Sequence, residues 1–88
     1  MYRVVYICYL IPYLCLSAIY ATQDDWVECG NYSLKGLDYD DNNLMLLNHL
    51  GVAMCKQGNR DGLQYLEKGR LLGDASCSGN FNYWEQRL

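Results

Sequence analysis

Residues 43–74 read NLMLLNHLGVAMCKQGNRDGLQYLEKGRLLGD, and they carry the clearest helical pattern in the chain. In the first half, apolar residues recur at intervals of three and four, which is the spacing of one helix face. These apolar residues are Leu44, Leu47, Leu50 and Met54, and Leu46 and Val52 widen the apolar face. Gly58-Asn59 follows, and both residue types tolerate the left-handed conformation that ends helices. The pattern predicts a helix over residues 44–57.

A second helix is predicted after a short polar turn. Asp61 is placed to cap its start, and the leucine pattern continues to about Leu72, where Gly73-Asp74 closes it. A glycine on an apolar helix face lets a neighbouring helix approach closely, because it has no side chain. Three glycines occupy such positions in the two helices: Gly51, Gly62 and Gly69. We therefore expect the two helices to pack closely.

Weaker helical patterns lie on both sides of this pair. Residues 26–37 predict a helix that begins after a cap at Asp24 or Asp25. Residues 75–88 carry aromatic side chains on a polar background and predict a terminal helix that covers the open end. The predicted class is all-α: a short stack of antiparallel helical hairpins, with about four helices after an N-terminal segment.

The N-terminal segment has a different composition from the rest. Arg3 is followed by an apolar run that has no charge before Asp24. A short basic start, an apolar core and a small residue at the end are typical of a secretory signal peptide. The prediction is a signal peptide over residues 1–21, cleaved after Ala21, with cleavage after Ala18 as the alternative.

Cleavage would leave residues 22–88 as one small helical-repeat domain. The run over residues 4–21 also reaches the lower length limit of a membrane-spanning helix, so a retained membrane anchor stays open as the alternative. The expected location is therefore secreted or periplasmic, or membrane-anchored if the segment is retained.

The charge balance excludes some classes of partner. The chain has ten acidic and seven basic residues, a net charge of −3, and residues 22–88 without Arg3 have a net charge of −4. Nucleic acids and anionic membrane surfaces bind basic proteins. We therefore expect no nucleic-acid partner. A domain of this size has a small core and often depends on a partner or a covalent cross-link.

No arrangement of residues indicates catalysis, a cofactor or a metal. His49 is the single histidine and has no carboxylate at helical spacing, so we interpret it as a partly exposed surface residue. Asp38, Asp40 and Asn42 alternate as in a calcium loop. The loop's required glycine and glutamate are replaced by Asn43 and His49. The sequence predicts neither an enzyme nor a metal site.

The chain also contains a weak internal repeat. Residues 32–36 and 65–69 match in Tyr, Lys and Gly at a shift of 33 residues, and helix–turn–helix units of this period resemble the tetratricopeptide repeat. Leu50-Gly51, then Gly58, then residues 65–69 are similar to that family's Leu-Gly, turn glycine and closing Tyr-Glu-Lys-Ala. Leu72-Gly73-Asp74-Ala75 resembles the related Sel1-like repeats. The chain departs from the pattern by having glycine for alanine and no proline after the second helix.

The resemblance covers residues 28–75 and implies one complete repeat between two half-repeats. Stacked helical hairpins bind proteins through the concave surface of their first helices. In the complete repeat, the family's ligand-facing positions fall on Met45, Asn48, His49, Val52 and Lys56. We therefore expect an exported helical-repeat protein that binds another protein or peptide. The open alternatives are a secreted effector or toxin-like protein, a membrane-anchored accessory subunit and an enzyme fragment.

The same stacking implies one disulfide. Three cysteines follow residue 21, and an exported protein meets oxidising conditions in which an odd count allows one bridge. Antiparallel packing of the helices over residues 26–37 and 44–57 would bring Cys29 near Cys55, with Cys77 at the opposite end. The expected bridge is Cys29–Cys55.

Overall fold

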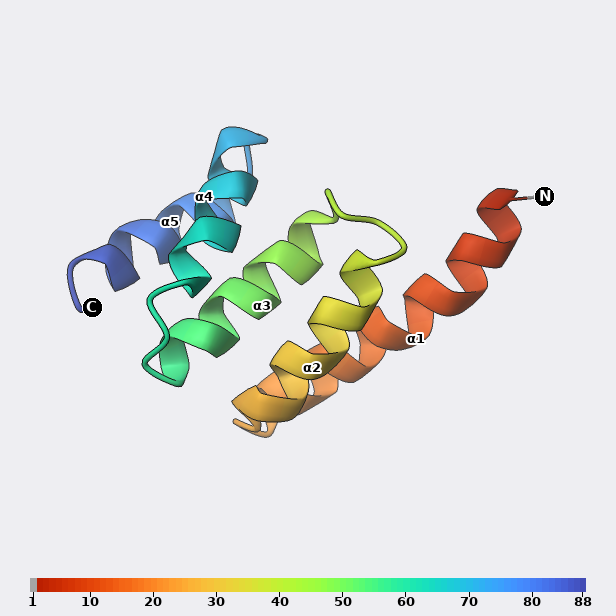
Figure 1. The fold of residues 1–88 in the computed structure, drawn as a ribbon, viewed down its shortest axis with the longest axis horizontal. Helices are drawn as coiled ribbons and strands as arrows, with labels where there is room; N and C mark the ends of the chain where they lie inside the picture. Colours follow the sequence, from red (N-terminus) through yellow and green to blue (C-terminus); the bar gives the residue numbers. More distant parts are fainter. Residues whose placement is uncertain (1) are drawn as a thin grey trace.

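The structure is a computed structural model, which describes the backbone of residues 2–88 and the side chains of residues 8–88. The described residues form five α-helices and no strand, so the predicted all-α class is confirmed (Figure 1). The helices are α1 (Tyr2–Thr22), α2 (Trp26–Leu37), α3 (Leu44–Lys56), α4 (Gly62–Leu71) and α5 (Ala75–Glu85). Helices α2 to α5 begin where the sequence patterns predict.

Helix α3 lies at the centre of the molecule. Each helix packs against the next one in the chain, and α3 also packs against α1 and α5. Figure 1 shows α1 and α2 on one side of α3, with α4 and α5 on the other. Within the described residues, neither α1 nor α2 packs against α4 or α5. The fold therefore consists of two three-helix units, α1–α2–α3 and α3–α4–α5, that share α3.

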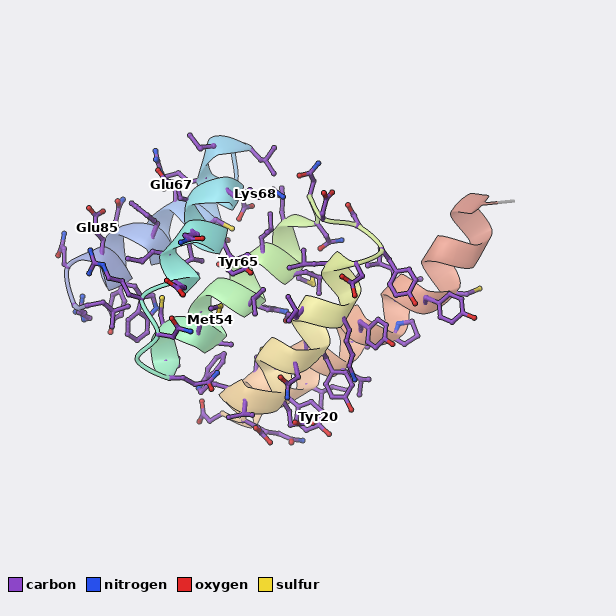
Figure 2. All side chains as sticks on the ribbon, in the orientation of Figure 1. Tyr20, Met54, Tyr65, Glu67, Lys68 and Glu85 are labelled. Atoms are coloured by element: carbon purple, nitrogen blue, oxygen red, sulfur yellow. The ribbon has the colours of Figure 1, made fainter. Side chains whose placement is uncertain are left out.

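The buried core has two parts, and α3 contributes to both. The first consists of Leu37, Leu46, Leu47 and Leu50, with Leu10, Leu14, Met54 and Tyr65 packed around them. Tyr65 reaches this part from α4 (Figure 2). The second consists of Cys55, Leu63 and Leu66, covered by Val52, Phe81, Trp84 and Leu88. Two aromatic residues of the terminal helix, Phe81 and Trp84, therefore cover the core, whereas Tyr83 is exposed.

The glycines on the inner faces allow the close helix packing that the sequence predicts. A Cβ atom on Gly51 would lie 2.5 Å from Leu66 Cγ, and one on Gly62 would lie 2.5 Å from the Gly51 carbonyl oxygen. A Cβ atom on Gly69 would collide with Cys77 of α5. Helices α3, α4 and α5 therefore approach one another more closely than side chains at these positions would permit.

Short polar side chains fix the starts of three helices. Asp25, Asn43 and Asp74 each accept a hydrogen bond from the backbone N–H three residues on. Asp61 makes no such bond, so its predicted role as a cap is wrong. Its backbone is already helical, whereas a capping residue is usually extended. The side chain of Asn59 instead accepts from the Asp61 N–H at 3.0 Å and stabilises the turn.

The N-terminal segment forms α1 and packs against α2 and α3. Ser17 is completely buried in this contact. Tyrosine rings stack between α1 and residues 32–39, with centroids 5.4–6.2 Å apart; the pairs are Tyr9–Tyr39, Tyr13–Tyr32, Tyr13–Tyr39 and Tyr20–Tyr32. In the part of the chain that is described, no helix combines the length and apolar character needed to cross a membrane. While present, the segment is an integral part of the helical body.

Candidate protein-binding face on helix α3

The five expected binding residues lie along α3, and two of them form hydrogen bonds with side chains of α1 and α5. His49 Nδ1 lies 2.9 Å from the hydroxyl oxygen of Ser17 in α1. On the other side, Asn48 accepts a hydrogen bond of 2.7 Å from Asn80 of α5. The candidate face is thus the side of α3 that lies between α1 and α5, and both polar contacts fix its side chains.

Three of the expected residues line one hollow. Met45, Asn48 and His49 form one wall of a cavity of about 440 Å³, which Leu44, Asp74 and Ser76 complete. Met45 is 54% exposed and available to a partner. The hollow combines an apolar thioether with an amide, an imidazole and a carboxylate. Such a set accommodates both the backbone and the side chains of a polypeptide.

His49 is partly exposed, as expected, but it has a partner that no local spacing rule indicates. The Ser17 hydroxyl lies 3.0 Å from the Leu14 carbonyl oxygen and donates to it. In that arrangement, His49 Nδ1 carries the proton and donates to Ser17, which leaves Nε2 as an acceptor. Burial lowers the pKa of His49 and favours the neutral ring. Ser17 is inaccessible to a substrate, so this serine–histidine pair lacks the access that a nucleophile needs.

The remaining two expected residues lie outside this hollow. Val52 is half-buried and packs against the second part of the core. Lys56 is exposed at the end of α3, and its ammonium lies over the rings of Trp26 and Trp84. The structure therefore joins Met45, Asn48 and His49 in one site and separates Val52 and Lys56 from it.

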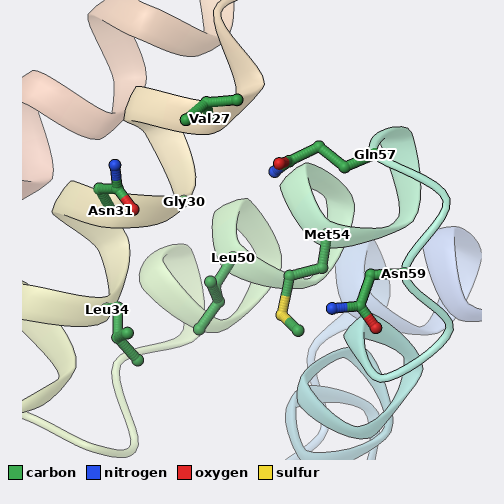
Figure 3. A pocket seen from close by; sticks show the side chains of 8 residues that line it. All are labelled: Val27, Gly30, Asn31, Leu34, Leu50, Met54, Gln57 and Asn59. Carbon is green, nitrogen blue, oxygen red and sulfur yellow. The ribbon is translucent and has the colours of Figure 1, made fainter.

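A second, smaller hollow lies between α2 and α3 and was not identified from the sequence. It has a volume of about 230 Å³ (Figure 3). Its lining consists of Val27, Gly30, Asn31, Leu34, Leu50, Met54, Gln57 and Asn59. The feature of the sequence that could have indicated this hollow is the set of three amide side chains, Asn31, Gln57 and Asn59, among apolar residues. Because Asn31 lies in α2 whereas Gln57 and Asn59 follow the end of α3, the proximity of the three amides depends on the tertiary fold.

The expected Cys29–Cys55 bridge is not formed. All three buried cysteines are free thiols. The Cys29 thiol points toward the His49 carbonyl oxygen at 4.0 Å, whereas Cys55 faces α4, where a Cβ on Gly62 would lie 3.0 Å from its sulfur. The two sulfurs therefore face different neighbours. Burial raises the pKa of Cys29 and Cys55, and burial together with Asp74 raises the pKa of Cys77 to about 12.

No group of three or more metal-ligating side chains occurs within the described residues. Comparison of the chain with family models, with curated proteins and with solved structures finds no match. The resemblance to tetratricopeptide and Sel1-like repeats therefore depends on the motifs in the sequence alone.

Proposed function

We propose that this chain is a small helical-repeat protein, tetratricopeptide-like or Sel1-like, that binds another protein or peptide through the face of α3 between α1 and α5. The observation that most directly supports this function is the hollow in which Met45, Asn48 and His49 lie together. Its mixed apolar and polar lining suits a polypeptide better than a small, uniformly apolar ligand.

The arrangement of the helices supports the repeat architecture. Helices α1, α3 and α5 pack in sequence along one layer, whereas α2 and α4 make no packing contact with each other within the described residues. In a curved stack of hairpins, the first helices lie closer together than the second helices, and their shared surface binds the ligand. The candidate face belongs to the closely packed layer.

The proposed location is secreted or periplasmic, with residues 4–21 as a membrane anchor in the alternative. The composition of residues 1–21 supports export. The buried Ser17 and the stacked tyrosines support the form of the protein that retains this segment. N-terminal sequencing of the protein from its native compartment separates the two: a start at Thr22, or at Ile19 for the alternative site, supports cleavage, and an intact Met1 contradicts it.

Position-specific photo-crosslinking tests the binding face. A photoreactive amino acid at Met45 is compared with the same group at Leu71, an exposed apolar residue of α4. We expect discrete cross-linked products from Met45 and none of the same size from Leu71. The Asn48→Ala substitution should reduce the Met45 products. Identical products at both positions, or none at Met45, would contradict the proposal.

A further inference from the structure

The end of α3 carries a cation between two tryptophan rings. The Nζ atom of Lys56, the last residue of α3, lies 5.5 Å from the ring centroid of Trp26 and 5.7 Å from that of Trp84. Both distances fall within the range of about 6 Å over which a ring face attracts a cation. Trp26 begins α2 and Trp84 lies near the end of α5, so each three-helix unit supplies one ring.

Several features show that this position favours a cation. Among the described residues the one ion pair joins Arg70 to Glu67, so the Lys56 ammonium has the two rings and no carboxylate as close partners. The last carbonyl groups of α3 place the negative end of the helix dipole beside it. Lys56 is exposed, whereas both tryptophans are half-buried. The two rings are therefore partly packed against the rest of the molecule, whereas the lysine is open to solvent.

Other contacts hold the two tryptophans in place. The Gln57 side chain donates to the carbonyl oxygens of Trp26 at 3.3 Å and Ala53 at 3.0 Å, which ties the start of α2 to the end of α3. Arg60 donates to the terminal Leu88 oxygen at 2.6 Å. Trp84 packs against the second part of the core. The pair of rings should therefore persist when Lys56 moves away.

We propose that Trp26 and Trp84 form a binding site for the ammonium group of a partner polypeptide's lysine, and that Lys56 occupies this site until the partner's cation displaces it. This inference deepens the proposed function and rests on it, because it assigns a chemistry to the partner segment that meets α3. The net charge of −3 draws cationic segments toward the molecule.

Tryptophan fluorescence provides a direct test, because the chain contains two tryptophans and both belong to the site. The probes are choline, a short lysine peptide and the same peptide with acetylated lysine. The neutral control is 3,3-dimethyl-1-butanol, in which carbon replaces the cationic nitrogen of choline. Choline and the lysine peptide should give saturable changes, whereas the alcohol and the acetylated peptide should give none.

The Lys56→Gln substitution tests displacement. If Lys56 fills the site in most molecules, its removal should tighten the apparent Kd for choline about fivefold. Adding Trp26→Phe to Lys56→Gln should weaken binding about two- to fivefold, because phenylalanine attracts cations less strongly. Circular dichroism should show the same helix content for both variants, since Lys56 is exposed and phenylalanine preserves an aromatic ring.

Equal responses to choline and its neutral analogue would overturn the cation site. Equal affinities of the wild type and Lys56→Gln for choline would overturn the occupation of that site by Lys56. A response to choline without one to the lysine peptide would overturn the polypeptide as the source of the ammonium. Cross-linking at Met45 tests the proposed function independently of the cation site. Loss of the cation response with intact cross-links contradicts the cation site alone, whereas loss of cross-links contradicts the proposed function.

Discussion

Gly51 and Gly62 determine how closely α3 and α4 approach. Each glycine faces the backbone or the core side chains of the other helix, and neither site has space for a methyl group. Gly79 in α5 provides a contrast, because a Cβ atom there would have no neighbour within 4 Å. Gly51 and Gly79 both lie within helices, but an added methyl group would collide with neighbouring atoms at Gly51 and meets open space at Gly79.

The Gly51→Ala substitution is expected to lower the free energy of unfolding by about 2 kcal/mol, because overpacking of Leu66 outweighs the gain in helix propensity. Gly79→Ala should raise it by about 0.5–1 kcal/mol, because alanine restricts the unfolded chain. Urea unfolding followed by circular dichroism measures both. Equal effects of the two substitutions would show that the contact between α3 and α4 does not limit packing.

The sequence predicted close packing at Gly51, Gly62 and Gly69 from their places on apolar helix faces, and a cap at Asp24 or Asp25, which Asp25 forms. Asp74 was predicted to close the preceding helix, and it also caps the start of α5. The sequence did not predict the partner of His49. Ser17 lies 32 residues earlier in the chain, and only the packing of α1 on α3 brings the two together.

At the scale of elements, α1 is the helix whose role changes most between sequence and structure. Its composition predicts a segment removed from the protein, while its contacts place a buried hydroxyl against His49 of α3. Ser33 of α2 is equally buried, but the Cys29 thiol beside it is a weak partner and no stronger one reaches its oxygen. Ser33 therefore serves as the control for Ser17, because the two serines are equally buried and differ in their hydrogen-bond partners.

Ser17→Ala should destabilise the full chain by about 1–2 kcal/mol, because His49 Nδ1 loses its partner in a half-buried site. Ser33→Ala should change stability by less than about 0.5 kcal/mol. Thermal unfolding of the chain with residues 1–21 present makes the comparison. A similar small effect for both serines would mean that α1 is held by apolar contacts alone.

The helices α2 to α5 were predictable because each has a local apolar period and local end signals. The candidate face is a proposal, and the structure groups only part of its expected residues: Met45, Asn48 and His49 share a hollow, whereas Val52 packs against the core. The period identifies a helix face, but the position of α5 determines which part of that face stays open.

At the scale of the whole molecule, the cysteines divide into two classes. Cys8 and Cys15 are exposed on α1, whereas Cys29, Cys55 and Cys77 are buried between helices. Burial also raises the pKa of the buried thiols, so fewer of them are in the reactive thiolate form.

In the folded full chain, we expect a maleimide reagent to modify Cys8 and Cys15 quickly and the other three cysteines only after denaturation. Mass spectrometry of intact protein counts the modified thiols. A chain that begins at Thr22 provides the control, because it lacks both exposed cysteines. Rapid modification of Cys55 or Cys77 in the folded full chain would contradict the packing of α3, α4 and α5.

Helix α3 belongs to both three-helix units and packs against all four of the other helices. If α3 unfolds, both units lose one of their three helices. We therefore expect the two halves to unfold cooperatively, although within the described residues their outer helices make no packing contact with each other. A ligand that stabilises α3 from one side raises the stability of both halves, and thermodynamic coupling across the molecule follows from this single shared element.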